Sequence, residues 1–560
     1  MEWKYIILNY MTLIAVLGLF TIILRKLWIS QICFSISFFL VGIVNYYMIK
    51  LHSLPLTIFE LKNFKTALDV INGYNIKIDN TVLLLIALEI PSIILAFIPK
   101  FVQKNYTLKQ NIIFNALTLI YCSALLYIGY LSEYSIKPHQ TIGWSWQESY
   151  QTYGYVACSI EMIQSSFHII QMPENYSEAA VQNIEIEVPE TFSERPDIIL
   201  ILNETFYDLN QIIDIKTDVP YFDNFYSLEN SIRGYSVVPV RMTNASEYEL
   251  LTSNSLQIMQ GITPFNVLDM TNANSIVSLM NQLGYNSIGA HPRTGENYSR
   301  GRAYPAMGFQ KIYFEEDFIN REFYSDRWFE TDDSLYQNLI TWYENNSEDN
   351  PLFIYLLTIQ NHADYEMNPP EVDSIHILGD YGEYTSRINE FLSCMKLSDT
   401  AFKDLTDYFL NVSKPVIICM VGDHSPYFAD DIVSEKYTGY EKDLRLRSTP
   451  FIIWSNRDME SKDVGYVSLN YIMPMVLEVA DLQRSPYYQY MLDLQKDVPV
   501  LSSFNMYMDS DGNITDYKTH TELTEKIENY FYLEYNNLSP NRNQVLFDVY
   551  SPFAMYDNIN

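Results

Sequence analysis

Cysteine is scarce in this 560-residue chain, and basic residues are outnumbered by acidic ones. The five cysteines are an odd number, and none has the C-x-x-C spacing. This pattern argues against a disulfide framework or a cysteine metal site and favours buried, apolar cysteines. Lysine and arginine total 36 against 68 aspartates and glutamates, a formal net charge of −32. A chain this acidic would repel a phosphate backbone, so no nucleic-acid partner is expected.

The charge is divided unevenly along the chain. Residues 1–134 carry a balance of +4, whereas the remainder carries −36. We expect 1–134 to form a transmembrane domain with about four helices and 135–195 to form a connector. A soluble domain is expected over 196–500, and a C-terminal subdomain packed on it over 501–560. The sequence therefore predicts a membrane part followed by an acidic globular part.

Four apolar runs are long enough, or nearly so, to cross a bilayer: 5–24, 29–48, 82–98 and 112–131. The third is the shortest and contains Glu89 and Pro91. A carboxylate within a membrane span is a functional candidate, and the alternative is that Glu89 pairs with a backbone group or a neighbouring helix. No small-residue cleavage site follows the first run, which argues against a cleaved signal peptide.

Positive charge predicts the orientation of these runs. Arg25 and Lys26 follow the first run, and Lys100, Lys104 and Lys109 follow the third. Because lysine and arginine concentrate in cytoplasmic loops, both loops are expected inside the cell. Everything after the fourth run, including the acidic domain, is then expected outside.

Four strand-like runs in the acidic part each lead into an ionisable residue: 197–202, 285–290, 352–357 and 416–421. Short, continuous apolar runs of this kind indicate strands buried on both faces of a parallel sheet. Helical patterns alternate with them, as at 275–283 and 388–409. The expected fold is therefore α/β, with a mostly parallel central sheet flanked by helices.

The residues that follow these strands predict a metal site. Open α/β sheets bind ligands at the carboxyl ends of their strands. There the sequence places a set of oxygen and nitrogen donors, Glu204, His291, His362, Asp423 and His424. Such a set suits a hard or borderline divalent cation.

A hydroxyl nucleophile is expected in the segment 241–253, which follows a strand-like run at 235–240 and opens an amphipathic stretch. Thr243 and Ser246 are both candidates. A hydroxyl at a helix N-terminus beside a metal can be deprotonated, and the N–H groups of the first turn favour an anion. The alternative is helix capping, with Ser246 and Glu249 forming a capping box.

Five sequence blocks resemble a known family. In order, they are Asn-Glu204, Thr243-x-x-Ser-Glu-Tyr-Glu-Leu-Leu-Thr, His291-Pro…Tyr298-Ser-Arg300…Tyr304…Gly308-Phe309, Gln360-Asn-His362 and Gly422-Asp423-His424. Together they resemble the lipoteichoic acid synthase and phosphoglycerol transferase family, part of the sulfatase and alkaline phosphatase superfamily. The resemblance covers most of 196–486. It implies an N-terminal transmembrane helix bundle and an extracellular, sulfatase-like catalytic domain in a multi-pass protein of the bacterial cell membrane.

The resemblance also implies roles for individual residues. Thr243 is implied as the nucleophile that takes the glycerol phosphate group as a phospho-threonine. One divalent metal, manganese or alternatively magnesium or zinc, is implied to bind Glu204, Thr243, Asp423 and His424. His362 is implied to contact the phosphate or protonate the leaving alcohol. The phosphoglycerol group is implied to be held by the remaining set, His291, Tyr298 and Arg300, the last as a planar fork for phosphate.

The implied activity is transfer of glycerol phosphate from the lipid phosphatidylglycerol to a glycolipid, a polyglycerolphosphate chain or a cell-surface polysaccharide. The alternative is another metal-dependent phosphotransferase, a sulfatase or a phosphodiesterase of the same superfamily. A sulfatase would carry a C/S-x-P-x-R motif, which Thr243-Asn-Ala-Ser lacks. The chain departs from many relatives at Tyr298, where they have tryptophan, and at Val240-Arg241-Met242, where they have glycine-rich or lysine-containing residues.

Overall fold

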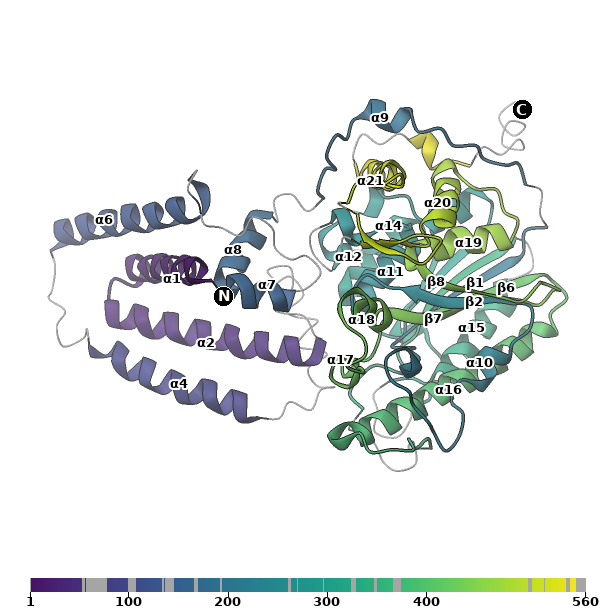
Figure 1. Cartoon of the computed structure of the whole chain (residues 1–560), viewed down its shortest axis with the longest axis horizontal. Coiled ribbons are helices and arrows are strands. Elements are labelled where there is room, and N and C mark those ends of the chain that lie inside the picture. The colour runs from purple at the N-terminus through teal and green to yellow at the C-terminus, as the bar shows by residue number, and fades with distance from the viewer. Residues whose placement is uncertain are drawn as a thin grey trace. The chain divides into compact units, whose positions relative to one another are not determined.

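The computed structural model describes residues 2–52, 56, 78–98, 107–132, 135, 146–165, 170–191, 194–259, 263–268, 270–295, 297–323, 329–346, 350–365, 374–501, 506–517, 519–539 and 544–549. These residues divide into two compact units (Figure 1). Described residues up to 165 form the first unit, and those from 170 onward form the second.

The first unit is a set of apolar helices: α1 (Trp3–Leu24), α2 (Leu27–His52), α4 (Asn80–Ala96) and α6 (Leu108–Leu126), with the shorter α7 (Trp146–Tyr153) and α8 (Tyr155–Ser165). Among the described residues, three helical segments are long and apolar enough to cross a membrane: Trp3–Leu24, Leu27–Tyr47 and Leu108–Leu131. The predicted third span forms α4, which at 17 residues is shorter than these. The protein therefore has apolar helices suited to a membrane anchor, and the count of four spans stays a prediction.

Glu89 lies on α4 and contacts a neighbouring helix. Ser35 of α2 donates a hydrogen bond to Glu89 Oε2 at 3.0 Å, and the Ser35 and Ser92 hydroxyls lie 2.7 Å apart. Pairing across helices is one of the two roles considered for Glu89 from the sequence, and the structure contains that pairing.

The second unit is built on a sheet that has eight strands among the described residues. In spatial order they are β4 (Lys311–Tyr313), β3 (Asn286–Ala290), β5 (Leu352–Leu357), β1 (Asp197–Asn203), β6 (Val416–Gly422), β7 (Ser448–Ser455), β2 (Ser231–Val237) and β8 (Lys462–Ser468). The first five pair in parallel. Within this sheet β7 runs antiparallel to both β6 and β2. The predicted α/β fold with a mostly parallel sheet is confirmed.

Helices cover both faces of the sheet (Figure 1). One face carries α10 (Asp223–Ser227), α15 (Asp332–Asn346) and α16 (Thr385–Leu410), and the other carries α11 (Thr243–Thr252), α14 (Arg300–Met307), α19 (Ile472–Val479) and α20 (Pro486–Asp497). Every residue of β1, β5 and β6 is buried. Their continuous apolar sequences follow from this burial, because no face of these central strands meets water.

The remaining described elements lie around this core. They are α9 (Glu178–Gln182), α12 (Pro264–Val267), α13 (Ile276–Gln282), α17 (Ala429–Ile432), α18 (Gly439–Leu446), α21 (Thr524–Leu538) and a small sheet of β9 (Val500–Leu501), β10 (Met506–Met508) and β11 (Ile514–Asp516). A turn at 509–512 is closed by the N–H of Gly512, which donates to the carbonyl of Asp509. Four of the five cysteines are buried, as expected, and Cys33 is half-buried.

Candidate active site

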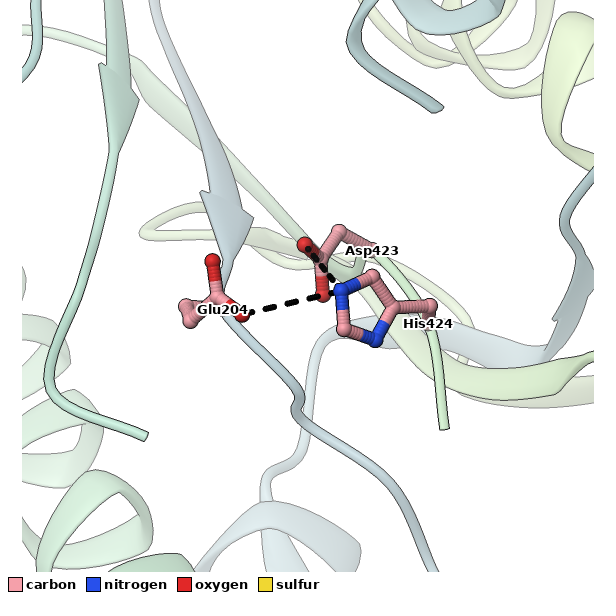
Figure 2. Close-up of side chains that lie close together, drawn as sticks. All are labelled: Glu204, Asp423 and His424. Atoms are coloured by element: carbon pink, nitrogen blue, oxygen red, sulfur yellow. Dashed lines mark ion pairs between the residues drawn. The ribbon is translucent and has the colours of Figure 1, made fainter. Parts of the chain in front are cut away.

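Three potential metal ligands meet at the carboxyl ends of β1 and β6. These strands pair in parallel with Asn203 opposite Gly422, so Glu204 and Asp423 leave the sheet side by side. His424 Nε2 lies 3.6 Å from Glu204 Oε1 and 3.4 Å from Asp423 Oδ2 (Figure 2). One ligand atom from each of the three residues lies within 4.8 Å of the others.

Gly422 is required by the close packing at this point. A Cβ atom there would lie 2.0 Å from the backbone oxygen of Phe206, a contact that only backbone movement could relieve. The glycine that precedes Asp423 therefore allows β6 to bring its aspartate beside Glu204.

Thr243 is the first residue of α11, and its hydroxyl faces this cluster. Thr243 Oγ1 donates to Glu204 Oε2 at 3.3 Å. Ser246, the other candidate nucleophile, is buried one turn later and donates to the backbone oxygen of Asp423 at 2.6 Å. The capping-box interpretation of Ser246 is wrong, because α11 begins three residues earlier and Met242 is its N-cap. Of the two hydroxyls, Thr243 is the one hydrogen-bonded to a carboxylate of the cluster.

The cluster has the electrostatics of a cation site. Burial raises the pKa of Asp423 to about 7, against the opposing hydrogen bonds from Thr243 and Thr205. Burial, followed by the charge of Asp423, raises the pKa of Glu204, against the opposing effects of His362 and His424. Burial lowers the pKa of His424 and so favours the neutral imidazole that binds metals.

The donor set also fits a divalent metal. Asp423 Oδ2 is buried, accepts no hydrogen bond among the described residues, and has the His424 ring at 3.4 Å beside it. A buried carboxylate oxygen without a partner is costly, and a cation would remove that cost. Two carboxylates, one imidazole and one hydroxyl are donors suited to manganese or zinc, and the oxygens also to magnesium.

Thr205 holds the two carboxylates in place, a role that the sequence did not reveal. Its backbone N–H donates to Asp423 Oδ1 at 2.6 Å, and its hydroxyl donates to Glu204 Oε1 at 2.8 Å. The residue is buried and has a φ of 47°, in the left-handed region. The one sequence feature that could have indicated this role is the position of Thr205, a short polar residue directly after Glu204.

Arg300 lies beside α11 in a buried ion pair. Its Nε donates to Glu247 Oε2 at 2.9 Å, and the two side chains are 2% and 0% exposed. Tyr304 donates to the other Glu247 oxygen at 2.5 Å. Glu247 follows Thr243 by four residues on α11, so both side chains lie on the same face of the helix. Sequence reasoning assigned no role to Glu247, although it stands inside a quoted block.

The aromatic and histidine residues expected to bind substrate extend this region. The guanidinium carbon of Arg300 lies 5.2 Å from the centre of the Tyr298 ring. His291, buried after β3, has Nδ1 3.4 Å from the backbone oxygen of Leu357. Burial, and then the charge of Arg300, lowers the pKa of His291 well below its usual value.

His362 is half-buried after β5, at the same edge of the sheet. Its Nδ1 lies 2.9 Å from the backbone oxygen of Ala363, and its ring lies 5.0 Å from that of Phe329. Its charge acts to lower the pKa of both Glu204 and His291. All eight site residues expected from the sequence therefore lie in or around one region of the second unit.

A carboxylate-rich candidate metal site at the carboxyl edge of a parallel sheet, facing a hydroxyl at a helix N-terminus, is the arrangement expected of the alkaline phosphatase and sulfatase enzymes. Residues 196–482, just over half of the chain, match the family described as Sulfatase. The chain belongs to the sulfatase family.

Individual relatives are distant. The putative cyclic beta-1,2-glucan modification protein of Rhizobium meliloti is 23% identical over 413 residues, which cover 70% of this chain and 63% of the relative. The chain thus spans less than two thirds of that relative's length. The structure of the Streptococcus pyogenes phosphoglycerol transferase GacH, in complex with sn-glycerol-1-phosphate, matches with a TM-score of 0.54 at 16% identity and covers 68% of this chain and all of GacH.

A further solved structure, the lipoteichoic acid synthase LtaP of Listeria monocytogenes, matches with a TM-score of 0.46 at 14% identity, covering 64% of this chain and 97% of LtaP. The sulfatase and alkaline phosphatase superfamily expected from the sequence blocks is confirmed by the match to the sulfatase family, and the chain shares its fold with GacH.

Proposed function

We propose that this protein is a membrane-anchored, metal-dependent phosphotransferase. It moves glycerol phosphate from phosphatidylglycerol, through a phospho-threonine at Thr243, to a glycolipid, a polyglycerolphosphate chain of lipoteichoic acid or a cell-surface polysaccharide. The observation that carries the proposal is the Thr243 hydroxyl, 3.3 Å from Glu204 Oε2 at the edge of a buried cluster of two carboxylates and a histidine.

In the first half of the reaction, the Thr243 hydroxyl releases its proton to solvent, Oγ1 attacks the phosphorus as the alkoxide, and the bond from phosphorus to the diacylglycerol oxygen breaks. Glu204 accepts a hydrogen bond from the threonine hydroxyl and so orients it for in-line attack. A divalent cation held by Glu204, Thr243, Asp423 and His424 would favour the alkoxide and neutralise charge on the phosphate oxygens. His362 donates a proton to the leaving alcohol.

In the second half, a hydroxyl of the acceptor attacks the phosphorus of phospho-Thr243. The bond to the threonine oxygen breaks, and His362, left without its proton, takes the proton of the attacking hydroxyl. Arg300, Tyr298 and His291 hold the phosphoglycerol group through both steps. The ion pair with Glu247 keeps the Arg300 guanidinium charged and oriented for phosphate.

The membrane helices and a relative's name support the choice of donor and acceptor. Three apolar helical segments suit a membrane anchor, which would keep the enzyme beside a lipid donor. We propose that the protein is multi-pass, with about four spans and an extracellular catalytic domain. A relative named for modification of cyclic beta-1,2-glucan supports a saccharide acceptor. Manganese is the proposed metal, with magnesium and zinc as alternatives.

The test is incubation of the purified protein with Mn²⁺ and phosphatidylglycerol labelled in its glycerol headgroup. We expect release of diacylglycerol and a labelled peptide that contains Thr243. Thr243→Ala should abolish both. Ser246→Ala, which removes the matched hydroxyl one turn later on α11, should still yield the labelled peptide.

Two outcomes would overturn parts of the proposal. Diacylglycerol release by Thr243→Ala would exclude Thr243 as the nucleophile. Turnover of an aryl sulfate, or of phosphatidylethanolamine, with none of phosphatidylglycerol would favour another activity of the superfamily. Parallel reactions with these substrates therefore separate the phosphoglycerol assignment from its alternatives.

A further inference from the structure

Behind the metal-ligand cluster lies a buried group of polar side chains, which we call the Asp332 network: Asp332, Asn203, Gln360, Asn361 and Ser398. All five are at most 3% exposed. Asp332 Oδ2 accepts hydrogen bonds from Asn203 Nδ2 at 2.9 Å and from Ser398 Oγ at 2.6 Å. The backbone N–H of Asp332 donates to Gln360 Oε1 at 2.9 Å. The network joins β1, the loop after β5, α15 and α16.

Asn203 connects this network to two metal ligands. It is the last residue of β1 and directly precedes Glu204. Its backbone oxygen accepts the N–H of Asp423 at 3.1 Å. Its side chain donates to Asp332 and accepts from Asn361 Nδ2 at 3.1 Å. A shift of Asn203 would therefore move both carboxylates of the cluster.

The loop after β5 is held by the same network. Asn361 Nδ2 also donates to Ser398 Oγ at 2.9 Å, and Gln360 Nε2 donates to the same oxygen at 3.0 Å. Thr358 Oγ1 accepts the backbone N–H of Glu204 at 3.0 Å. In the Gln360-Asn361-His362 block, the two amides thus belong to the network, and the histidine that follows lies beyond the carboxyl end of β5, the strand paired in parallel with β1.

Asp332 is the acceptor on which these bonds converge. It is 0% exposed, and its other carboxylate oxygen has no hydrogen-bond partner among the described residues. Hydrogen bonds are stronger in a low-dielectric interior, and a satisfied polar network restricts its members to one geometry. One of its two carboxylate bonds ends on Asn203, directly before Glu204. The other ends on Ser398, which accepts from Asn361, directly before His362. Loss of the carboxylate would therefore loosen both segments together.

We propose that Asp332 is a positioning residue that acts through Asn203 and Asn361 to set the places of Glu204, Asp423 and His362. The inference rests on the proposed metal site and adds a residue outside the quoted sequence blocks. The hydrogen bonds of its carboxylate end on Asn203 and Ser398, which are not among the proposed metal ligands. Its effect is transmitted by the last residue of β1 and by the loop that ends in His362.

A matched control lies at the other end of β1. Asp197 is the first residue of the strand and is also 0% exposed. It accepts hydrogen bonds from the N–H of Leu352 at 2.6 Å, Lys414 at 2.7 Å and Tyr343 at 3.0 Å. Asp197→Ala removes an equally buried carboxylate from the same strand, at the end opposite to the ligand Glu204. Loss of stability alone should therefore affect both alanine variants.

The experiment measures Mn²⁺ affinity by titration calorimetry on the purified full-length protein. We expect Asp332→Ala to weaken Mn²⁺ binding about tenfold or more, as for other groups that orient metal ligands. Asp197→Ala should bind Mn²⁺ like the wild type. Asp332→Asn retains an oxygen able to accept both Oδ2 hydrogen bonds and should recover most of the affinity. Ser398→Ala, a milder change, should weaken binding about fivefold, the worth of one hydrogen bond.

The outcomes separate this inference from the proposed function. Unchanged Mn²⁺ affinity in both Asp332→Ala and Ser398→Ala, beside a clear loss in Glu204→Ala, would overturn the positioning role and leave the metal site intact. An equal loss of Mn²⁺ affinity in Asp197→Ala would show that lower stability alone explains the effect, and would also overturn the positioning role. Absence of Mn²⁺ binding by the wild type would overturn both proposals. Mn²⁺ binding without turnover of phosphatidylglycerol would overturn the proposed substrate alone.

Discussion

The buried ion pair between Glu247 and Arg300 leads to a quantitative prediction. The two side chains are 0% and 2% exposed, so neither charge is compensated by water. Burial acts to lower the pKa of Arg300, but the charge of Glu247, with smaller effects of Tyr304 and Tyr355, holds it above its usual value. Glu247→Ala would leave a charged guanidinium buried without its partner. Such a change costs about 3–5 kcal/mol of folding free energy.

A double-mutant cycle tests this reasoning. Glu247→Ala and Arg300→Ala should each destabilise the protein, but the double variant should be less destabilised than the sum of the two. The difference, the coupling energy, should reach about 2–3 kcal/mol because the two groups are in contact. The measurement is denaturant unfolding of the purified protein in detergent, followed by tryptophan fluorescence.

An exposed pair provides the control for this cycle. Lys526 and Asp497 lie 2.5 Å apart, but their side chains are 53% and 41% exposed. Their coupling should stay below about 1 kcal/mol, as for other surface pairs. If the effects of Glu247→Ala and Arg300→Ala add to within about 0.5 kcal/mol, the pair is not coupled and the argument from burial is refuted.

Three further predictions concern stability and metal binding. Burial raises the pKa of Glu249 from 4.5 to about 8, so the folded state keeps a proton that the unfolded state releases, and stability should fall as pH rises from 4.5 to 8. Glu249→Gln keeps an acceptor for the N–H of Leu256 and should remove up to about 5 kcal/mol of this loss of stability. The measurement is the free energy of unfolding as a function of pH, and a variant with the same pH dependence as the wild type would contradict this prediction. Mn²⁺ at about 100 times its dissociation constant should stabilise the wild type by about 2.7 kcal/mol, seen as a rise in the unfolding midpoint, and Glu204→Ala should lose this rise. Gly422→Ala should destabilise the protein by about 3 kcal/mol or more, because the new Cβ meets the Phe206 backbone oxygen at 2.0 Å, and a wild-type midpoint would show that β6 can shift.

The central strands could be predicted from the sequence because their burial is complete. The runs at 197–202, 352–357 and 416–421 are continuous and apolar, and they form β1, β5 and β6 with ends that differ by at most one residue. Parallel pairing then places the residues after them at one edge. This geometry, and not the identity of any single residue, brings Glu204, Asp423 and His424 together.

The edge of the sheet was harder to predict. β2 was expected at 235–240 and forms over Ser231–Val237, because it pairs antiparallel with β7 along its whole length. β8 was not predicted, since its residues are largely exposed and lack an apolar run. The bounds of β2 and the existence of β8 depend on strands that are distant in the sequence. Local sequence patterns carry no information about those pairing partners.

The acids that support the site were missed for a related reason. Glu247 and Asp332 are fully buried, yet their neighbours in the sequence do not mark them as internal. Their partners, Arg300 and Ser398, lie 53 and 66 residues away. A buried charge is tolerated because of such partners. Burial of these acids can therefore be predicted only when the fold shows which residues lie beside them.

Thr205 has a consequence for how the enzyme would acquire its cofactor. Its two donors restrain the neighbouring carboxylates even when no cation joins them. These two ligands are then ordered when the chain folds. A metal that enters from solution would find both carboxylates already in position. If the proposed metal site is correct, we expect a chelator to remove the ion without unfolding the protein, so that a different ion can then be bound.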